Sequence, residues 1–396
     1  MKCSLCKKND LDFVFSLGKQ PLANKYPKDK NEIKNENLFD MNINFCSFCL
    51  SCTLNIDIDR KIFFSDYYYL SSVNSELVEH FNELALELKN KKFVIDIGSN
   101  DGILLRPLKN NNVKSIGIEP SENVGAMANF NGFKTIISFF DNKCAKLILD
   151  KYERPDCIVA SSVFTHLDNP NQFIIDARDI LDDDGVLIIE VEYLLSILKN
   201  VEFERFYFDR PYYYTLSCLK EIFTNNEMDI VDVKFIKPHG GSLRIYVKKK
   251  NNNQKISKSV LELYEEEKKL ITIDYIKNQF HNFSNEINAL KTKLIDLKKN
   301  NSNVKGYGAP ARLATITNFG KINKDLISHI IDDSELKINR FTPGMHIPIL
   351  PYDKNSNLEE VILFAYEYYD SIKKKSNNSR INFYKPIPFK KMNWFS

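Results

Sequence analysis

The sequence lacks a net charge of either sign. Its 55 basic residues nearly balance its 52 acidic residues, which leaves a formal net charge of +3. Proteins that bind nucleic acids usually carry a clustered basic excess. The lysine-rich segments here, such as KKKNNNQK, are interpreted instead as solvated connectors. We therefore expect no nucleic-acid partner, and any anionic ligand must be met by a local patch of charge.

Long apolar runs are also missing. The most apolar candidate, VLIIEVEYLLSIL, is interrupted by Glu190 and Glu192, and no run approaches the roughly 20 residues that span a bilayer. The N-terminal stretch MKCSLCKKND lacks the apolar core of a secretory signal. These absences predict a cytoplasmic protein with no membrane partner. Because that compartment is reducing, the eight cysteines are not expected to form disulfides.

Strand-like and helical patterns alternate between residues 93 and 247. Four apolar runs are expected to be buried parallel strands: FVIDIG, KSIGIEP, CIVASS and GVLIIEVE. Helical spacing is found at 75–90 and again at 171–182, while DIVDVKFI and SLRIYVKK are expected to pair as strands. This alternation is typical of a doubly wound α/β domain. The chain of 396 residues, 43% of them hydrophobic, is long enough for two to three domains.

The C-terminal part predicts a long helix and then a second α/β unit. Residues 254–299 are strongly helical and place one apolar stripe at Phe283, Ile287, Leu290, Leu294 and Leu297. The stripe favours packing within its own domain over a coiled-coil partner, because the repeat is short. The segment VKGYGAPARLATITNF has a glycine turn before a helical pattern, and ISHIIDDS and EEVILFAYEY are expected strands. The oligomeric state is left open.

Two cysteine pairs predict a structural zinc site. Cys3-x-x-Cys6 and Cys46-x-x-Cys49 are separated by residues 7–45, and each pair places two thiolates on one tight turn. Four thiolates complete a closed tetrahedral zinc site, which indicates a structural rather than a catalytic metal. Cys52 is a spare that either replaces Cys49 or is simply buried. The remaining cysteines lie in apolar contexts and are expected in cores: Cys144, Cys157 and Cys218.

A glycine loop predicts a site for a nucleoside that carries a positive charge. FVIDIGSNDGILLRPL is interpreted as strand, turn and helix, with D-x-G-x-N-x-G spacing at Asp96, Gly98, Asn100 and Gly102. Dinucleotide fingerprints place glycine where the backbone meets a pyrophosphate, but here Asn100 and Asp101 stand in the loop. Glu119 follows Gly98 by 21 residues, the usual place for an acid that binds ribose hydroxyls. S-adenosylmethionine fits this pattern better than NAD.

With these motifs, the chain resembles the sugar C-methyltransferase family over essentially its whole length. The similarity runs through the cysteine pairs, SLGKQPLAN, FSDYYYLSSVNSELVEHF, IDIGSNDGILLRPL, GIEPS, SSVFTHL, HGGSLR, GYGAPARLATITNFG and DDSELKINRFTPGMHIPI. The resemblance implies a methyltransferase that uses S-adenosylmethionine on a nucleotide-linked keto-deoxysugar, in deoxysugar or surface-glycan biosynthesis. It also implies an α/β fold with a zinc-binding module at 1–70, a Rossmann-like methyltransferase domain at 71–253 and a second Rossmann-like domain at 254–396. The substrate is expected between the two Rossmann-like domains.

The family pattern carries catalytic roles onto five positions of this sequence: Tyr69, His166, Tyr207, Asp209 and Arg210. The stretch RFYFDRPYYY matches a segment that typically has tyrosine, any residue, glutamate and histidine. In the family that histidine is the favoured base for the carbon next to the keto group. Here Asp209 replaces the glutamate and Arg210 replaces the histidine.

Arg210 changes the chemistry that is expected. Arginine stays protonated and cannot be the base, but it can steady an enolate, a phosphate or a carboxylate. The base role then moves to His166 or Asp209, or else the reaction methylates an oxygen or nitrogen and forms no carbanion. A non-catalytic nucleotide-sugar-binding protein is a further alternative, and so is a plain loop in which Asp209 and Arg210 pair with each other.

Two sets of binding residues are predicted for this sequence. Those expected to bind the methyl donor are Asp96, Gly98, Asn100, Asp101, Gly102, Glu119, Pro120 and Ser162. Those expected to bind the substrate are His239, Gly240, Gly241, Arg244 and Arg312. Two interpretations stay open for the glycines: Gly240 and Gly241 form either a substrate-contacting turn or a bulge. Gly306, Gly308 and Arg312 either bind phosphate at a helix N-terminus or let a helix close tightly onto a strand.

Overall fold

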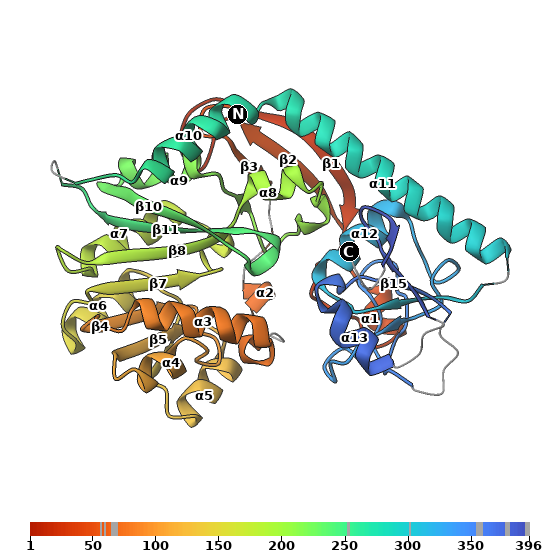
Figure 1. The fold of residues 1–396 in the computed structure, drawn as a ribbon, viewed down its shortest axis with the longest axis horizontal. Coiled ribbons are helices and arrows are strands. Elements are labelled where there is room, and N and C mark those ends of the chain that lie inside the picture. Colours follow the sequence, from red (N-terminus) through yellow and green to blue (C-terminus); the bar gives the residue numbers. More distant parts are fainter. Residues whose placement is uncertain are drawn as a thin grey trace. The chain divides into compact units, whose positions relative to one another are not determined.

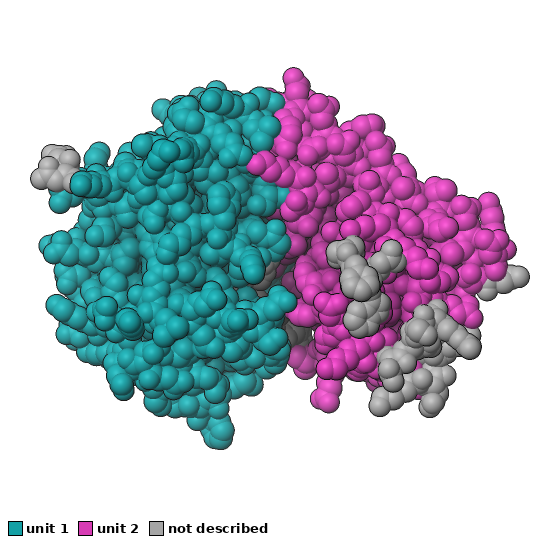
Figure 2. All heavy atoms as spheres, viewed as in Figure 1, with its two compact units in different colours: residues 1–12, 45–196, 210–272 teal, residues 13–44, 197–209, 273–396 magenta. Residues whose placement is uncertain are grey.

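A computed structural model describes residues 1–55, 58, 61–64, 70–251, 254–300, 302–353, 359–376 and 381–392. Tyr69, one of the predicted catalytic residues, lies outside the described residues. The chain forms two compact units (Figure 2). Unit 1 comprises residues 1–12, 45–196 and 210–272, and unit 2 comprises residues 13–44, 197–209 and 273–396. Each unit is therefore assembled from segments that are far apart in the sequence.

Unit 1 contains a seven-stranded sheet of order β10-β11-β8-β7-β4-β5-β6 (Figure 1). The strands from β8 to β6 in this order are parallel, and β11 runs antiparallel to both of its neighbours. Their bounds are β4 Phe93–Ile97, β5 Lys114–Glu119, β6 Thr135–Ile137, β7 Cys157–Ser161, β8 Val186–Glu192, β10 Met228–Ile236 and β11 Ser242–Lys249. The four parallel strands and the strand pair predicted from the sequence are confirmed, and so is the α/β class.

Helices lie between the strands of unit 1. Buried side chains of α3, among them Phe81 and Leu84, pack with residues of the parallel strands such as Val94 and Val159. The expected helix at 171–182 is α7, which starts at a proline where the Asn169 side chain caps the helix. The helices of this part are α2 Lys61–Phe64, α3 Ser75–Glu87, α4 Leu105–Asn110, α5 Glu122–Phe130, α6 Asn142–Lys151, α7 Pro170–Ile180, α9 Leu216–Asn225 and α10 Lys258–Leu270. Helix α8, Leu194–Lys199, contains the point at which the chain passes from unit 1 to unit 2.

The N-terminal module contains the strands β1, β2 and β3 and a short helix, α1. In unit 1, β3 pairs antiparallel with β9, with Cys52 opposite Tyr213. Most of β1 and β2 belongs to unit 2, together with the short helix α1. The bounds are β1 Leu11–Gln20, α1 Lys30–Lys34, β2 Phe39–Cys46, β3 Ser51–Leu54 and β9 Tyr212–Tyr213.

Unit 2 contains a second, six-stranded sheet of order β14-β13-β12-β15-β16-β17. All its strands are parallel except β17, which is antiparallel to β16. The bounds are β12 Val304–Tyr307, β13 Ile330–Ile331, β14 Ile349–Leu350, β15 Glu360–Leu363, β16 Asn382–Lys385 and β17 Lys390–Lys391. Its helices are α11 Ile273–Lys299, α12 Ala311–Gly320 and α13 Tyr369–Ser376. The second α/β unit predicted from the sequence is thus confirmed.

The single helix expected at 254–299 is two helices. Helix α10 ends at Leu270, and α11 starts at Ile273. Ile271 adopts an extended conformation between them, which ends the first helix. The predicted apolar stripe is buried in α11 from Phe283 to Leu297. Among the described residues, no helix is both long and apolar enough to cross a membrane.

Candidate functional site

The four predicted zinc ligands come together in unit 1. The Cys3 and Cys49 sulfurs are 3.9 Å apart, the Cys6 and Cys46 sulfurs are 3.7 Å apart, and all four lie within 4.8 Å of one another. In a tetrahedral zinc site with Zn–S bonds of about 2.3 Å, the sulfurs are about 3.8 Å apart, so the buried set fits the metal. Cys52 lies in β3 outside this group, so it does not replace Cys49.

The glycine loop between β4 and α4 is held in conformations that its residue types allow. Gly98 has φ +73°, Asn100 has φ +48° and Gly102 has φ +85°, a region that glycine and asparagine adopt most easily. A Cβ on Gly98 would collide with the side chain of Val163, and one on Gly102 would lie 2.5 Å from the Phe133 ring. The backbone is thereby kept close to the sheet end, where open α/β sheets bind ligands.

Glu119, the last residue of β5, binds the backbone of this loop. Its Oε2 accepts the Asn100 N–H at 3.0 Å, and its Oε1 accepts the Ser121 N–H at 2.8 Å. Burial raises the pKa of Glu119, and these two hydrogen bonds oppose the shift. A carboxylate has about four lone-pair positions, so each oxygen retains acceptor capacity for a ribose hydroxyl. The carboxylate fits the role predicted for it.

Two acidic groups make this loop suitable for a cationic ligand. Asp101 accepts hydrogen bonds from the Ser72 backbone and hydroxyl through Oδ2, whereas its buried Oδ1 has no hydrogen-bond partner. Asp96 is buried in β4, where burial and the charges of Glu119 and Glu190 raise its pKa well above the usual value. An unpaired buried acceptor is costly. The amino group of S-adenosylmethionine would relieve that cost, so the loop fits this cofactor.

A buried polar network, in which Arg244 is the one residue predicted from the sequence, lies at the carboxyl ends of β7 and β8. Glu190 accepts hydrogen bonds from His80 at 3.0 Å, Ser161 at 2.6 Å and Arg244 at 2.6 Å. Arg244 also reaches Glu87 on α3 at 3.3 Å. Burial alone would raise the pKa of Glu190, but the hydrogen bond from His80 and the charge of Arg244 lower it to about 2. Arg244, predicted to bind substrate, is therefore engaged within unit 1.

Glu192 is the second acid on the same face of β8. It forms a buried ion pair with Arg210, between Arg210 Nη1 and Glu192 Oε1. Side chains alternate along a strand, so Val186 and Ile188 of this face join the core while Glu190 and Glu192 lie at its carboxyl end. Acids at alternate positions ending a buried strand were the available sequence signal.

The other predicted site residues are distributed over both units. His166 ends a 3₁₀ turn after β7 and is half-buried in unit 1, and Ser162 has φ +58° beside it. Tyr207 and Asp209 belong to unit 2, where Tyr207 packs on Ala23.

The HGG segment lies between β10 and β11. A Cβ on Gly241 would lie 3.1 Å from Ser196 Oγ, which agrees with a close backbone approach. Gly240 has φ +77° beside it. His239 belongs to the short 3₁₀ turn before β11, and Pro120 is half-buried at the end of β5.

Arg312 lies in the first turn of α12 in unit 2. Its guanidinium pairs with Glu367 at 2.5 Å and stacks on the Tyr366 ring, 4.5 Å from the centroid. Its Nη1 is buried and has no hydrogen-bond partner. Glu204, nearby and fully buried, has both carboxylate oxygens without a hydrogen-bond partner. Burial and the charge of Glu202 raise the pKa of Glu204 to about 7.

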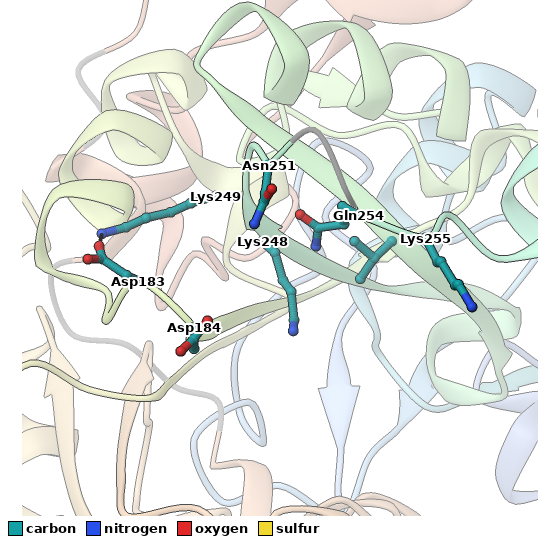
Figure 3. Close-up of a pocket in the computed structure, with 8 residues that line it drawn as sticks. Asp183, Asp184, Lys248, Lys249, Asn251, Gln254 and Lys255 are labelled. Atoms are coloured by element: carbon teal, nitrogen blue, oxygen red, sulfur yellow. Dashed lines mark hydrogen bonds and ion pairs between the residues drawn. The ribbon is translucent and has the colours of Figure 1, made fainter.

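A hollow of about 320 Å³ lies near the amino ends of the parallel strands of unit 1. This is the end of the sheet opposite to the glycine loop, and Figure 3 shows the residues that line the hollow. Its lining includes Asp183 and Asp184, which precede β8, and Lys248 and Lys249 at the end of β11. Asp183 and Lys249 form an ion pair of 2.8 Å. Since ligands of open α/β sheets bind at the carboxyl ends of the strands, this hollow is separate from the glycine-loop site.

Models of known families match three consecutive segments of the chain. A zinc binding domain matches residues 3–64, a methyltransferase domain matches residues 69–233, and a C-methyltransferase C-terminal domain matches residues 237–388. The C-methyltransferase NovU of Streptomyces niveus is 25% identical over 356 residues, covering 88% of this chain and 85% of that protein.

Solved methyltransferase structures resemble part of the chain. Magnesium protoporphyrin IX methyltransferase of Synechocystis PCC 6803, with bound S-adenosylmethionine, matches with a TM-score of 0.34 and 15% identity, covering 44% of this chain and 79% of that one. The CcbJ methyltransferase of Streptomyces caelestis matches with a TM-score of 0.35 and 14% identity, covering 43% of this chain and 90% of that one.

The matched domains follow the order in which the zinc ligands, the glycine-loop domain and the second α/β sheet occur along the chain. The cysteine cluster fits zinc, and the glycine loop with Glu119 and Asp101 fits S-adenosylmethionine. The chain therefore resembles the C-methyltransferases along all three matched segments, and it is an S-adenosylmethionine-dependent methyltransferase with a structural zinc site.

Proposed function

We propose that the protein methylates a carbon atom of a nucleotide-activated keto-deoxysugar, in deoxysugar or surface-glycan biosynthesis. The observation that supports this most is the glycine loop with Glu119, which fits the methyl donor, beside a row of buried charged groups at the same sheet end. The zinc-binding, donor-binding and C-terminal functions are assigned to residues 1–70, 71–253 and 254–396. The proposed location is the cytoplasm, where thiolates stay reduced.

When bound, the donor supplies an electrophilic methyl group on a sulfonium sulfur. The residues of the chain act on the nucleophile and on binding. Glu119 holds the ribose, and Asp101 holds the amino group. His166 accepts the proton from the carbon next to the keto group, since an imidazole is the side chain best suited to exchange a proton near neutral pH.

Arg210 is assigned to charge stabilisation rather than to proton transfer. A guanidinium keeps its proton, and Glu192 fixes this one by a buried ion pair. A fixed cation stabilises the oxygen on which negative charge develops during proton removal. Tyr207 and Asp209 remain proposed site residues by the family pattern, as does Tyr69.

The replacement of the family's histidine by Arg210 also supports a second candidate. Methylation of an oxygen or nitrogen of an amino or acidic sugar needs no carbanion, and an arginine would then bind a substrate carboxylate or phosphate. Incubation of the enzyme with labelled donor and a panel of nucleotide sugars, followed by mass spectrometry and NMR, tests both. A methyl group on carbon supports the first candidate, and one on oxygen or nitrogen the second. No transfer to any nucleotide sugar contradicts both candidates.

A further inference from the structure

Two tyrosines in and next to β9 bind the turn that contains His166. The Tyr214 hydroxyl donates to the Phe164 carbonyl oxygen at 3.2 Å, and the Tyr212 hydroxyl donates to the Asp168 carbonyl oxygen at 3.1 Å. Phe164 and Asp168 lie two positions before and two positions after His166. The carbonyl groups that end a short helical turn need donors from outside it. The two phenols therefore fix the backbone on both sides of His166.

Tyr214 suits this role because its side chain is buried and rigid. It has no exposed surface, and its ring packs near the Phe164 ring with the centroids 5.2 Å apart. A buried phenol needs a hydrogen-bond partner, and a tyrosine side chain loses little conformational entropy when it is fixed. Tyr212 is buried as well. The contact between these tyrosines and the His166 turn is thus part of the core of unit 1.

The same segment holds Arg210. The carbonyl oxygen of Pro211, the next residue, accepts the Leu54 N–H of β3 at 2.9 Å. The Arg210 guanidinium forms its buried ion pair with Glu192 at the end of β8. The backbone beside Arg210 and its side chain are therefore both held. The proposed proton acceptor and the proposed stabilising cation depend on one short segment, residues 210–215.

The zinc cluster supports this segment through β3. The strand starts two residues after Cys49, and its Cys52 lies opposite Tyr213 of β9. The buried Thr215 hydroxyl donates to the Cys49 carbonyl oxygen at 3.2 Å and accepts the Cys218 N–H, in the first turn of α9, at 3.0 Å. A zinc ligand is thereby tied to both ends of the segment that follows Arg210.

The donor loop is supported from a different strand. The Gly98 N–H donates to the Ile118 carbonyl oxygen at 2.7 Å, and the Asn100 N–H donates to Glu119 at 3.0 Å. Both acceptors belong to β5. The supports of the donor loop and of residues 210–215 can therefore be disturbed separately.

We propose that Tyr212 and Tyr214 are positioning residues for His166, and that the zinc cluster supports them through β3 and Thr215. The proposal rests on the proposed function, in which His166 accepts the proton and Arg210 stabilises the developing charge. A general base acts only within hydrogen-bond reach of the proton that it removes. A displacement of about 1 Å can lower a rate on the order of 100-fold. Loss of either phenol therefore slows methyl transfer and leaves donor binding intact.

Amide hydrogen exchange on the full chain tests the positioning role without any substrate. Tyr212→Phe and Tyr214→Phe each remove one hydroxyl and keep the ring. The His166 amide, which donates to the Val163 carbonyl oxygen at 2.8 Å, should exchange about five-fold faster or more in each variant, since one hydrogen bond of the turn is lost. Unchanged exchange of this amide in both variants would overturn the positioning role.

Two controls separate this effect from a general loss of stability. The amides of residues 98–102 should exchange within about two-fold of wild type in both variants, because the donor loop has its own supports. Tyr152→Phe removes the hydroxyl of a tyrosine that stacks on Phe93 in the same unit, and it should leave the His166 amide unchanged. Equally faster exchange at His166 and in the donor loop would mean that the tyrosines only stabilise unit 1, and would overturn the proposal.

The link to the zinc cluster is tested with the metal in place. Thr215→Val keeps all four cysteines and lacks the hydroxyl that binds Cys49. It should retain about one zinc per chain, and the amides of His166 and of residues 210–215 should exchange about five-fold faster. Thr215→Ser, which restores a hydroxyl, should return the exchange to that of wild type. Wild-type exchange in Thr215→Val would overturn the link.

Rate measurements distinguish a failure of this proposal from a failure of the proposed function. With the nucleotide sugar that the wild-type protein methylates, Tyr214→Phe should lower kcat by about ten-fold or more and leave KM for S-adenosylmethionine unchanged. Faster exchange at His166 with a wild-type kcat would keep Tyr214 as the support of this turn and overturn His166 as the proton acceptor. A lower kcat with unchanged exchange would keep the proposed function and overturn the positioning role.

Discussion

The two glycine loops share a backbone arrangement and differ in the charges around it. In each unit an acid at the end of the second strand accepts one N–H from the loop and one from its own i+2 residue. The unit 1 loop adds Asp101, whereas the unit 2 loop has Arg312 and Lys337 close by. The comparison teaches that one backbone arrangement can carry an unpaired carboxylate oxygen in unit 1 and cationic side chains in unit 2, so the side chains rather than the backbone distinguish the two loops.

The largest effect is expected at the zinc cluster, which belongs wholly to unit 1. Cys46→Ser removes one of four thiolates, and structural zinc in small zinc-binding peptides contributes about 10–16 kcal/mol to folding. We expect about one zinc per chain in the wild-type protein, loss of the metal in the variant and a large fall of its unfolding temperature. The matched control is Cys52→Ser, a buried thiol outside the cluster. Equal zinc content in wild type and Cys46→Ser would contradict the assignment.

The next largest effect is expected at Glu204 in unit 2. Its folded-state pKa of about 7 lies above the usual 4.5, so the folded state binds more protons than the unfolded state between these values. Stability should therefore fall as pH rises from about 4.5 to 7, by up to about 3 kcal/mol. Glu204→Gln should remove this fall in urea unfolding at pH 5 and pH 8. Glu202→Gln, which loses the partner of Arg205, should be destabilised at both pH values. If Glu204→Gln kept the pH dependence of the wild-type protein, Glu204 would not be the carboxyl of unit 2 whose pKa is raised.

A smaller effect is expected from Arg210→Lys in unit 1. Lysine keeps the charge but loses the planar fork that pairs with Glu192, so substrate binding should weaken by about 1–2 kcal/mol. Donor binding, which depends on the glycine loop, should stay within about two-fold. Arg178→Lys, at a partly exposed ion pair of the same unit, is the control and should change neither. Donor binding that weakens as much as substrate binding would mean that Arg210 supports the unit 1 loop itself.

The smallest effect is expected from His80→Gln. Glu190 has a folded-state pKa of about 2, below the usual 4.5, despite the opposing effect of its burial, because of His80 and Arg244. Its contribution to stability is present above pH 4.5 and is lost as pH falls towards 2. Removing His80 should move the midpoint of acid unfolding upwards by about half a pH unit, since about 1 kcal/mol of a charged hydrogen bond is lost. His281→Gln, at an exposed histidine, is the control and should leave the midpoint unchanged. An unchanged midpoint in His80→Gln would mean that His80 does not stabilise the charged form of Glu190.

Much of the fold and part of the site could be predicted from the sequence. The strand runs, the cysteine pairs and the acid after the glycine turn are local patterns with a fixed physical meaning. The roles of Cys46 and Glu119 could therefore be predicted from the sequence alone. The Glu190 network could not, because His80, Ser161 and Arg244 approach Glu190 through sheet register and helix packing. The sequence does not predict the break between α10 and α11 at Ile271, because both flanking segments are good helix formers.

The central claim is that the unit 1 loop, and not its counterpart in unit 2, binds the methyl donor. Its most direct test is calorimetric titration of S-adenosylmethionine into wild-type protein and the Glu119→Gln variant. The account predicts one donor molecule per chain and affinity weaker by about ten-fold or more in the variant, because a charged acceptor of the ribose hydroxyls is lost. Two equivalent donor sites per chain, or unchanged affinity in Glu119→Gln, would contradict it.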